Sequence, residues 1–137
     1  MEDVVDLADR FFKAIEGGDI DAVRAIYAPD AVIWHNFDSL DARSTGQSAE
    51  ENLKVLEGLP QRISGATYRV LQREATQTGF VQQHVLTGTM LNGEPLVLPA
   101  CIICEVKDGR IARLDEYFDP AISARLHEVT AQFSRSS

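Results

Sequence analysis

The sequence has few basic residues: 13 lysines and arginines stand against 21 aspartates and glutamates, for a formal net charge of -8. The basic residues form no cluster, so we expect neither a nucleic acid nor a membrane as a partner. No apolar run approaches the length of a membrane span, and Glu2, Asp3 and Asp6 stand where a secretory signal would carry basic residues. These absences predict a cytoplasmic protein.

The sequence also has little that would hold a cofactor or a metal ion. It contains no glycine-rich phosphate loop and no nucleophile elbow. The three histidines, His35, His84 and His127, belong to different predicted elements. Cys101 and Cys104 lie three residues apart in a predicted strand and so face opposite sides, which disfavours a disulfide and a shared metal. We therefore expect no metal, no cofactor and two buried thiols.

The first half of the chain shows helical periodicity. With 137 residues and 45% hydrophobic composition, the chain is long enough for one domain, residues 1–137, with a buried core. Apolar spacing and capping signals predict three N-terminal helices: 4–15, ended by Gly17; a short one capped by Asp19 and ended by Pro29; and one opened by the capping box of Ser48 and Glu51 that runs to about Leu56.

The second half shows the alternation that is typical of strands. We expect strands over residues 31–37, 66–75, 80–91, 96–106 and 110–118. Asp119 followed by Pro120 then opens a short C-terminal helix. Helices followed by a meander of strands predict an α+β fold, with the three N-terminal helices packed on a curved antiparallel sheet.

Three local patterns accompany this layout: Gly17-Gly18-Asp19 after the first helix, Tyr27-Ala28-Pro29-Asp30-Ala31-Val32 at the first strand, and Asp108-Gly109-Arg110-Ile111 through Tyr117-Phe118-Asp119 near the end. Together they resemble the nuclear transport factor 2-like superfamily, in its SnoaL-like and ketosteroid-isomerase-like branch. The resemblance implies a cone-shaped α+β barrel whose open side holds a pocket. It predicts fold better than chemistry, because this fold hosts isomerases, dehydratases, hydrolases, cyclases and binding modules.

Three enzyme types with this fold point to candidate catalytic residues. Resemblance to the steroid isomerases puts a general base at His35. The two oxyanion-hole donors of those enzymes fall at Phe11 and Ile102, so ketosteroid isomerase itself is excluded. Similarity to the limonene-epoxide hydrolases puts a carboxylate at Glu116, without the middle-strand arginine, and similarity to scytalone dehydratase puts one of its two histidines at His84.

Strand parity puts each of these residues on the same face of its own strand as apolar neighbours: His35 with Ile33, His84 with Leu86, and Glu116 with Leu114 and Phe118. We take this face as the concave one, and predict that His35, His84 and Glu116 line a cavity there. The expected ligand-binding residues are Tyr27, Ile33, Gln82, Leu86, Ile102, Leu114 and Phe118. A bulge in the strand 31–37 would bring Trp34 and Asn36 to the pocket instead.

These residues predict a pocket protein for a hydrophobic small molecule such as a polyketide, terpenoid or steroid-like compound. If it is an enzyme, His35, His84 and Glu116 would share acid–base work in an isomerisation, elimination or hydrolysis without a cofactor. A carboxylate beside two imidazoles should hold one histidine protonated. The alternative is a non-catalytic ligand-binding or dimerisation module of the same fold.

The outer face of the predicted sheet carries apolar side chains that the helices leave uncovered. They are Val81, Val85, Ile103 and Tyr117. Because a second copy would remove these side chains from water, we expect a homodimer.

Overall fold

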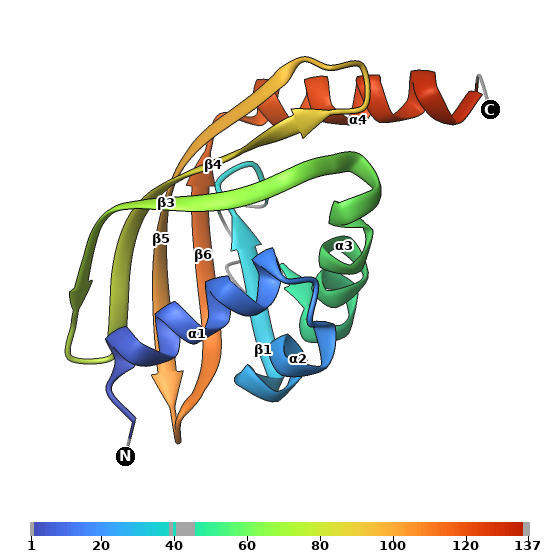
Figure 1. Cartoon of the computed structure of the whole chain (residues 1–137). Coiled ribbons are helices and arrows are strands. Elements are labelled where there is room, and N and C mark those ends of the chain that lie inside the picture. The colour runs from blue at the N-terminus through green and yellow to red at the C-terminus, as the bar shows by residue number, and fades with distance from the viewer. Residues whose placement is uncertain (1, 39, 41–45, 136–137) are drawn as a thin grey trace.

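The computed structural model describes residues 2–38, 40 and 46–135. Its helices are α1 (Val4–Glu16), α2 (Ile20–Ile26), α3 (Ala49–Arg62) and α4 (Pro120–Arg135). Its strands are β1 (Tyr27–His35), β2 (Gln47–Ser48), β3 (Ile63–Ala75), β4 (Gly79–Met90), β5 (Pro95–Lys107) and β6 (Arg110–Phe118). In Figure 1, α1 crosses the hollow side of a curled sheet, α2 and α3 lie beside β1, and α4 lies at the opposite end.

The six strands form one sheet in the order β2-β1-β6-β5-β4-β3. It is curled but not closed, because β2 and β3 are its two edges. From β3 to β6, each strand pairs antiparallel with the next one along the chain, as predicted. The predicted α+β class is confirmed, but the sheet is mixed rather than purely antiparallel, because β1 pairs with β6 in parallel. Alternation predicts that a segment is a strand, and it carries no information on the direction of a distant partner.

The predicted capping residues form hydrogen bonds at the first turns of α2, α3 and α4. The Asp19 carboxylate accepts from the Ala22 backbone N–H at 3.1 Å, and Ser48 and Glu51 form the reciprocal capping box at the start of α3. At α4, the Asp119 carboxylate accepts from the Ala121 N–H at 2.9 Å. Each bond satisfies a backbone donor that has no partner within its helix, and contributes about 1 kcal/mol.

Several predicted boundaries are wrong. Strand β1 begins at Tyr27 and ends at His35, rather than covering 31–37, because the chain is already extended at Tyr27. Pro29 lies where the register of β1 shifts, a place where its missing N–H interrupts no regular ladder. Helix α3 continues to Arg62 with Pro60 in its last turn, and α4 is 16 residues long rather than short.

Two clusters of buried apolar side chains fill the fold. The larger one joins the helices α1, α2 and α3 to the sheet and includes Phe11, Val23, Ile26 and Ile33. The smaller one lies beneath α4 and consists of Ile63, Leu86, Met90, Leu96, Leu126 and Val129. Tyr68 packs against both clusters, which places it at the boundary between them.

The burial predicted for the two cysteines is confirmed for Cys104 but not for Cys101. Cys104 is buried and Cys101 half-buried, and both are free thiols. They come from the same strand, β5, with their side chains on opposite faces. Burial raises the pKa of the Cys104 thiol well above its ordinary value, which makes it an inert core residue.

Candidate functional site

His35 and Glu116 meet where β1 and β6 run side by side. They are direct partners in the parallel register, and His35 Nε2 lies 3.1 Å from Glu116 Oε1. On the other side of the ring, Nδ1 lies 3.6 Å from Asp38 Oδ2. The same Asp38 oxygen accepts the backbone N–H of His35 at 2.8 Å, which fixes the turn after the strand.

Aromatic rings enclose this pair. Phe37 stacks on the His35 ring with centroids 5.1 Å apart, and Phe118 meets it edge-on at 5.7 Å. Only 14% of the His35 side chain and 23% of the Glu116 side chain are exposed. A charged pair that is partly withdrawn from water interacts more strongly than one on the surface.

The pKa of His35 is raised above its ordinary value. Burial opposes this change and is the largest single influence, but the hydrogen bond and charge of Glu116, with a contribution from Asp38, outweigh it. The carboxylate therefore favours the protonated imidazole.

Two adjoining hollows lie on the concave side of the sheet, and Glu116 lines both. The outer chamber has a volume of about 310 Å³ and lies between α3, α4 and the sheet. The inner chamber, about 50 Å³, lies between α1 and the sheet. Asn52, Leu56 and Tyr68 also border both chambers, so they mark the passage between them.

Most of the predicted pocket residues line these chambers. His35 and Glu116 do so, and so do Tyr27, Ile33, Leu86, Ile102, Leu114 and Phe118. Trp34 instead lies on the other face, where its ring meets Tyr117 edge-on at 5.7 Å. The Asn36 amide oxygen accepts the Phe118 backbone N–H, so it braces β6. The alternative in which Trp34 and Asn36 line the pocket is therefore contradicted.

His84 and Gln82 lie behind the cavity wall rather than in it. Both are almost fully buried, with 1% and 0% of their surface exposed. The His84 ring packs against Phe12 and Tyr68 at centroid distances of 5.2 and 5.1 Å, and both of those rings line the inner chamber. His84 is not hydrogen-bonded to His35 or Glu116, so the structure joins only two of the three predicted catalytic residues directly.

The pKa of His84 is lowered. Burial is the main cause, and the positive charge of Arg73 adds to it, whereas the negative charge of Glu116 acts in the opposite direction. The two histidines therefore differ: the environment favours the charged form of His35 and the neutral form of His84.

Sequence reasoning missed a polar group at the passage between the chambers. The Tyr27 hydroxyl donates to Asn52 Oδ1 at 2.7 Å, and the Asn52 amide donates to Gln47 at 3.0 Å. Asn52 is 7% exposed, and it belongs to the same α3 stripe as Ala49, Leu53 and Leu56. A single amide within an apolar helical stripe was the available signal.

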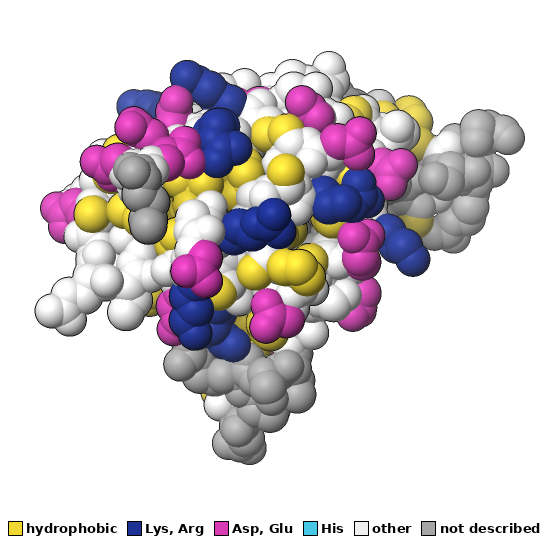
Figure 2. Space-filling model, turned by 90° about the horizontal axis from the view of Figure 1, so that it is seen from below, with side chains coloured by type: hydrophobic (Ala, Val, Ile, Leu, Met, Phe, Trp, Pro, Cys, Tyr) yellow, Lys and Arg dark blue, Asp and Glu magenta, His cyan; other side chains and the backbone are white. Residues whose placement is uncertain are grey.

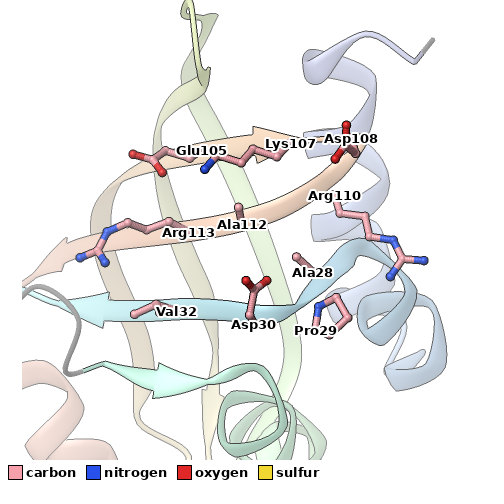
Figure 3. A pocket seen from close by; sticks show the side chains of 10 residues that line it. All are labelled: Ala28, Pro29, Asp30, Val32, Glu105, Lys107, Asp108, Arg110, Ala112 and Arg113. Carbon is pink, nitrogen blue, oxygen red and sulfur yellow. The ribbon is translucent and has the colours of Figure 1, made fainter.

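A larger hollow of about 480 Å³ lies on the outer face of the sheet, where β1, β6 and β5 run together. Figure 3 shows that Ala28 and Ala112 leave its floor open, with Arg110 and Arg113 at opposite ends. The other charged residues of its lining are Asp30, Glu105, Lys107 and Asp108, so the hollow carries both signs of charge. None of the predicted site residues reaches it. We assign the site to the concave side, because there the partly buried His35–Glu116 pair and the buried Asn52 amide meet a mostly apolar cavity.

The charge distribution agrees with the absence of a basic cluster in the sequence. On the face seen in Figure 2, acidic and basic side chains lie close together, with small hydrophobic patches between them. In the described part of the chain, no group of three histidine, cysteine or acidic side chains could hold a metal ion. Among the same residues, every helix is too short or too polar to cross a membrane.

The curled sheet, its covering helices and the concave cavity with its histidine–carboxylate pair define a small α+β pocket protein. The chain belongs to the family of SnoaL-like domains, whose sequence profile matches residues 8–114.

Solved structures with this fold include proteins of several named activities. PrhC from Penicillium brasilianum is 15% identical with a TM-score of 0.79, over 96% of this chain and 89% of that one. IdmH from Streptomyces antibioticus, described as a proposed polyketide cyclase, is 22% identical with a TM-score of 0.76, over 93% and 99%. An epoxide hydrolase of the LEH-like type from M. tuberculosis is 18% identical with a TM-score of 0.72, over 98% and 96%. At these identities the likeness shows the fold alone. No curated protein matches the sequence significantly.

Proposed function

We propose that the protein binds an apolar small molecule in the concave cavity and acts on it by acid–base catalysis without a cofactor. The observation that carries this proposal is the His35–Glu116 pair, with Nε2 and Oε1 3.1 Å apart at the wall of a mostly apolar cavity. One structural neighbour is described as a proposed polyketide cyclase, which supports a polyketide-like ligand, and another as an epoxide hydrolase. A terpenoid or steroid-like ligand is the alternative that the resemblance in the sequence implies.

The size of the cavity supports a ligand of a few fused rings. The outer chamber, at about 310 Å³, falls at the lower end of the range of roughly 300–1,000 Å³ for small-molecule sites. The inner chamber measures about 50 Å³. A water molecule needs only about 10–15 Å³ measured in this way, so the inner chamber has room for a small polar group such as a carbonyl. We place the carbon frame in the outer chamber and its oxygen at the inner one.

In this proposal Glu116 is the base and His35 is its charged partner. The carboxylate takes a proton from a carbon next to the ligand's carbonyl group. The proton then returns at another carbon in an isomerisation, or protonates a departing hydroxyl in an elimination. His84 lies behind the inner chamber, and once the rings of Phe12 and Tyr68 move aside it donates a hydrogen bond to the oxygen on which negative charge develops. Such a donor is worth about 3 kcal/mol in a dry site.

The experiment is a turnover assay on two-ring compounds of three classes: a β,γ-unsaturated ketone, a β-hydroxy ketone and an epoxide. We expect wild-type protein to convert at least one class, and Glu116→Gln and His35→Asn to lose this activity while still folding. Leu98→Trp, which fills the outer chamber, should abolish binding as well as turnover. Binding without turnover in any class would contradict catalysis and leave a binding protein.

That second function, a non-catalytic ligand carrier, is favoured by one observation. His84 lies behind the cavity wall, so His35 and Glu116 are the only predicted catalytic groups among the described lining residues. A carrier needs shape rather than converging polar groups. It predicts that Glu116→Gln and His84→Ala each keep ligand affinity within a few-fold.

The partner and location expected from the sequence are part of the same proposal. Ile103 and Tyr117 are each 44% exposed on the outer face, which supports a homodimer through that face. The free thiols Cys101 and Cys104 suit the reducing cytoplasm.

A further inference from the structure

We infer that Arg73 and Gln82 lock His84 in the tautomer that carries its proton on Nε2, and that this buried donor selects ligands with an oxygen acceptor at their inner end. The first part stands on the geometry of three side chains. The second part rests on the proposed function, because it needs a ligand in the concave cavity.

The direction of the hydrogen bonds follows from the chemistry of arginine. Arg73 Nε lies 2.6 Å from Gln82 Oε1, and a guanidinium group has only donors. The carbonyl side of the Gln82 amide must therefore face Arg73. Its NH₂ group then faces His84 Nδ1, at 2.8 Å, and can only donate to it. Because Nδ1 accepts a hydrogen bond, the proton of the neutral imidazole is on Nε2.

The same contacts oppose a second proton on His84. A protonated ring would turn an N–H at Nδ1 toward the N–H groups of Gln82. Gln82 cannot turn over to relieve this contact, because its nitrogen would then face the donors of Arg73. The lowered pKa of His84, caused mainly by burial, has the same direction.

Arg73 is itself held in place. Its side chain is 12% exposed, and its Nη1 lies 3.8 Å from Asp9 Oδ1 on α1. Gln82 is fully buried. The contacts from Asp9 through Arg73 and Gln82 to His84 therefore run from α1 through the edge strand β3 to the middle of β4. The burial of Arg73 and Gln82 limits the rotation of these two side chains.

At the far end of these contacts, the Nε2 donor of His84 lacks a partner among the described residues. His84 Nε2 is inaccessible to water and makes no hydrogen bond to any residue that the structure describes. A buried donor without an acceptor costs about 1–3 kcal/mol. The flanking rings of Phe12 and Tyr68 both line the inner chamber, and the inference requires these rings to shift so that a ligand oxygen in this chamber meets Nε2. A ketone, ester or enolate oxygen meets this requirement, whereas a cation or a hydrocarbon does not.

The tautomer can be measured without a ligand by long-range nitrogen-15 NMR of the histidine rings near neutral pH. We expect wild-type His84 to show a protonated Nε2 and an unprotonated Nδ1. In Gln82→Glu the carboxylate presents one oxygen to Arg73 and the other to His84 Nδ1. The proton of the His84 ring should therefore move to Nδ1, or the ring should take up a second proton and become charged. Gln83→Glu adds the same charge to the next, exposed residue of β4 and should leave the His84 signals unchanged. A protonated Nδ1 in the wild type, or an unchanged tautomer in Gln82→Glu, would overturn the inference.

The ligand preference is tested with a matched pair of probes, 2-acetylnaphthalene and 2-isopropenylnaphthalene. The carbonyl oxygen of the first is replaced by a CH₂ group in the second, and the rest of the molecule is the same. We expect wild type and Gln83→Glu to bind the ketone about fivefold to tenfold more tightly, the worth of one buried hydrogen bond. Gln82→Glu should lose this preference if its proton has moved to Nδ1 and keep it if the ring has become charged, because a charged ring still has an N–H at Nε2. Equal affinity of wild type for both probes would overturn the ligand part. Failure of both probes to bind would contradict the proposed pocket function and the ligand part with it, while the tautomer measurement still decides the first part.

Discussion

His35 Nε2 lies 3.1 Å from Glu116 Oε1, on adjacent parallel strands, while His84 is surrounded by aromatic rings with an amide at its Nδ1. The pKa of His35 is raised because the charge and hydrogen bond of Glu116 outweigh burial, and that of His84 is lowered chiefly by burial. An NMR titration should therefore show His35 losing its proton above about pH 6.5 and His84 below it. If the two histidines lost their protons at the same pH, the opposite pKa shifts described for His35 and His84 would be wrong.

The same pair should make stability depend on pH. The folded pKa of His35 is above its unfolded value, so the stabilisation is complete below about pH 6.5 and is lost as the pH rises through the folded pKa. Glu116→Gln removes the charge that raises this pKa. The loss of unfolding free energy in this variant should be larger at about pH 6 than at about pH 9. Chemical denaturation at both pH values measures it.

Glu94→Gln is the matched control for this measurement. Glu94 pairs with Arg125, which stays charged throughout this range, so its removal should cost the same at both pH values. If Glu116→Gln lowered the unfolding free energy equally at both pH values, the charge of Glu116 would not be what raises the pKa of His35.

A third prediction concerns the hydroxyl of Tyr27. It donates to Asn52 Oδ1 at 2.7 Å in a buried position. Tyr27→Phe should lower the unfolding free energy by about 1–2 kcal/mol, since it leaves a buried acceptor without this partner. Tyr117→Phe makes the same chemical change at a side chain that is 44% exposed in the single chain, and should change the stability of the monomer by less than about 0.5 kcal/mol. Equal effects of the two variants would contradict the role of the Tyr27–Asn52 bond.

Much of the fold could be predicted from local chemistry. The caps at Asp19 and Ser48 act within one helical turn, so the residues themselves determine them. The alternation in β6 likewise placed Leu114, Glu116 and Phe118 on the cavity side. Such features need no knowledge of distant contacts.

What could not be predicted depends on residues that are far apart in the chain. The parallel pairing of β1 with β6 brings His35 to Glu116, 81 residues away. Parity gave His84 the correct face, but the rings of Phe12 and Tyr68 come from other elements and separate it from the open cavity. Only the packed structure shows which side chain covers which.

A fourth prediction concerns association. If the outer face joins two copies, Ile103→Glu should give a monomer, because it places a charge in the middle of that face. Leu71→Glu, at a side chain that is 57% exposed on the edge strand β3, should leave the dimer intact. Light scattering at micromolar concentration measures the mass. A wild-type monomer under these conditions would contradict the homodimer.

The central claim, that the His35–Glu116 pair moves protons on a ligand held in the concave cavity, can be tested before the natural substrate is known. The measurement is the exchange of the methyl protons of 2-acetylnaphthalene in deuterium oxide, followed by proton NMR. We expect wild-type protein to accelerate exchange by about 100-fold or more over buffer, and Glu116→Gln and His35→Asn to lose most of this acceleration. Saturable binding of the ketone with exchange no faster than in buffer would contradict it.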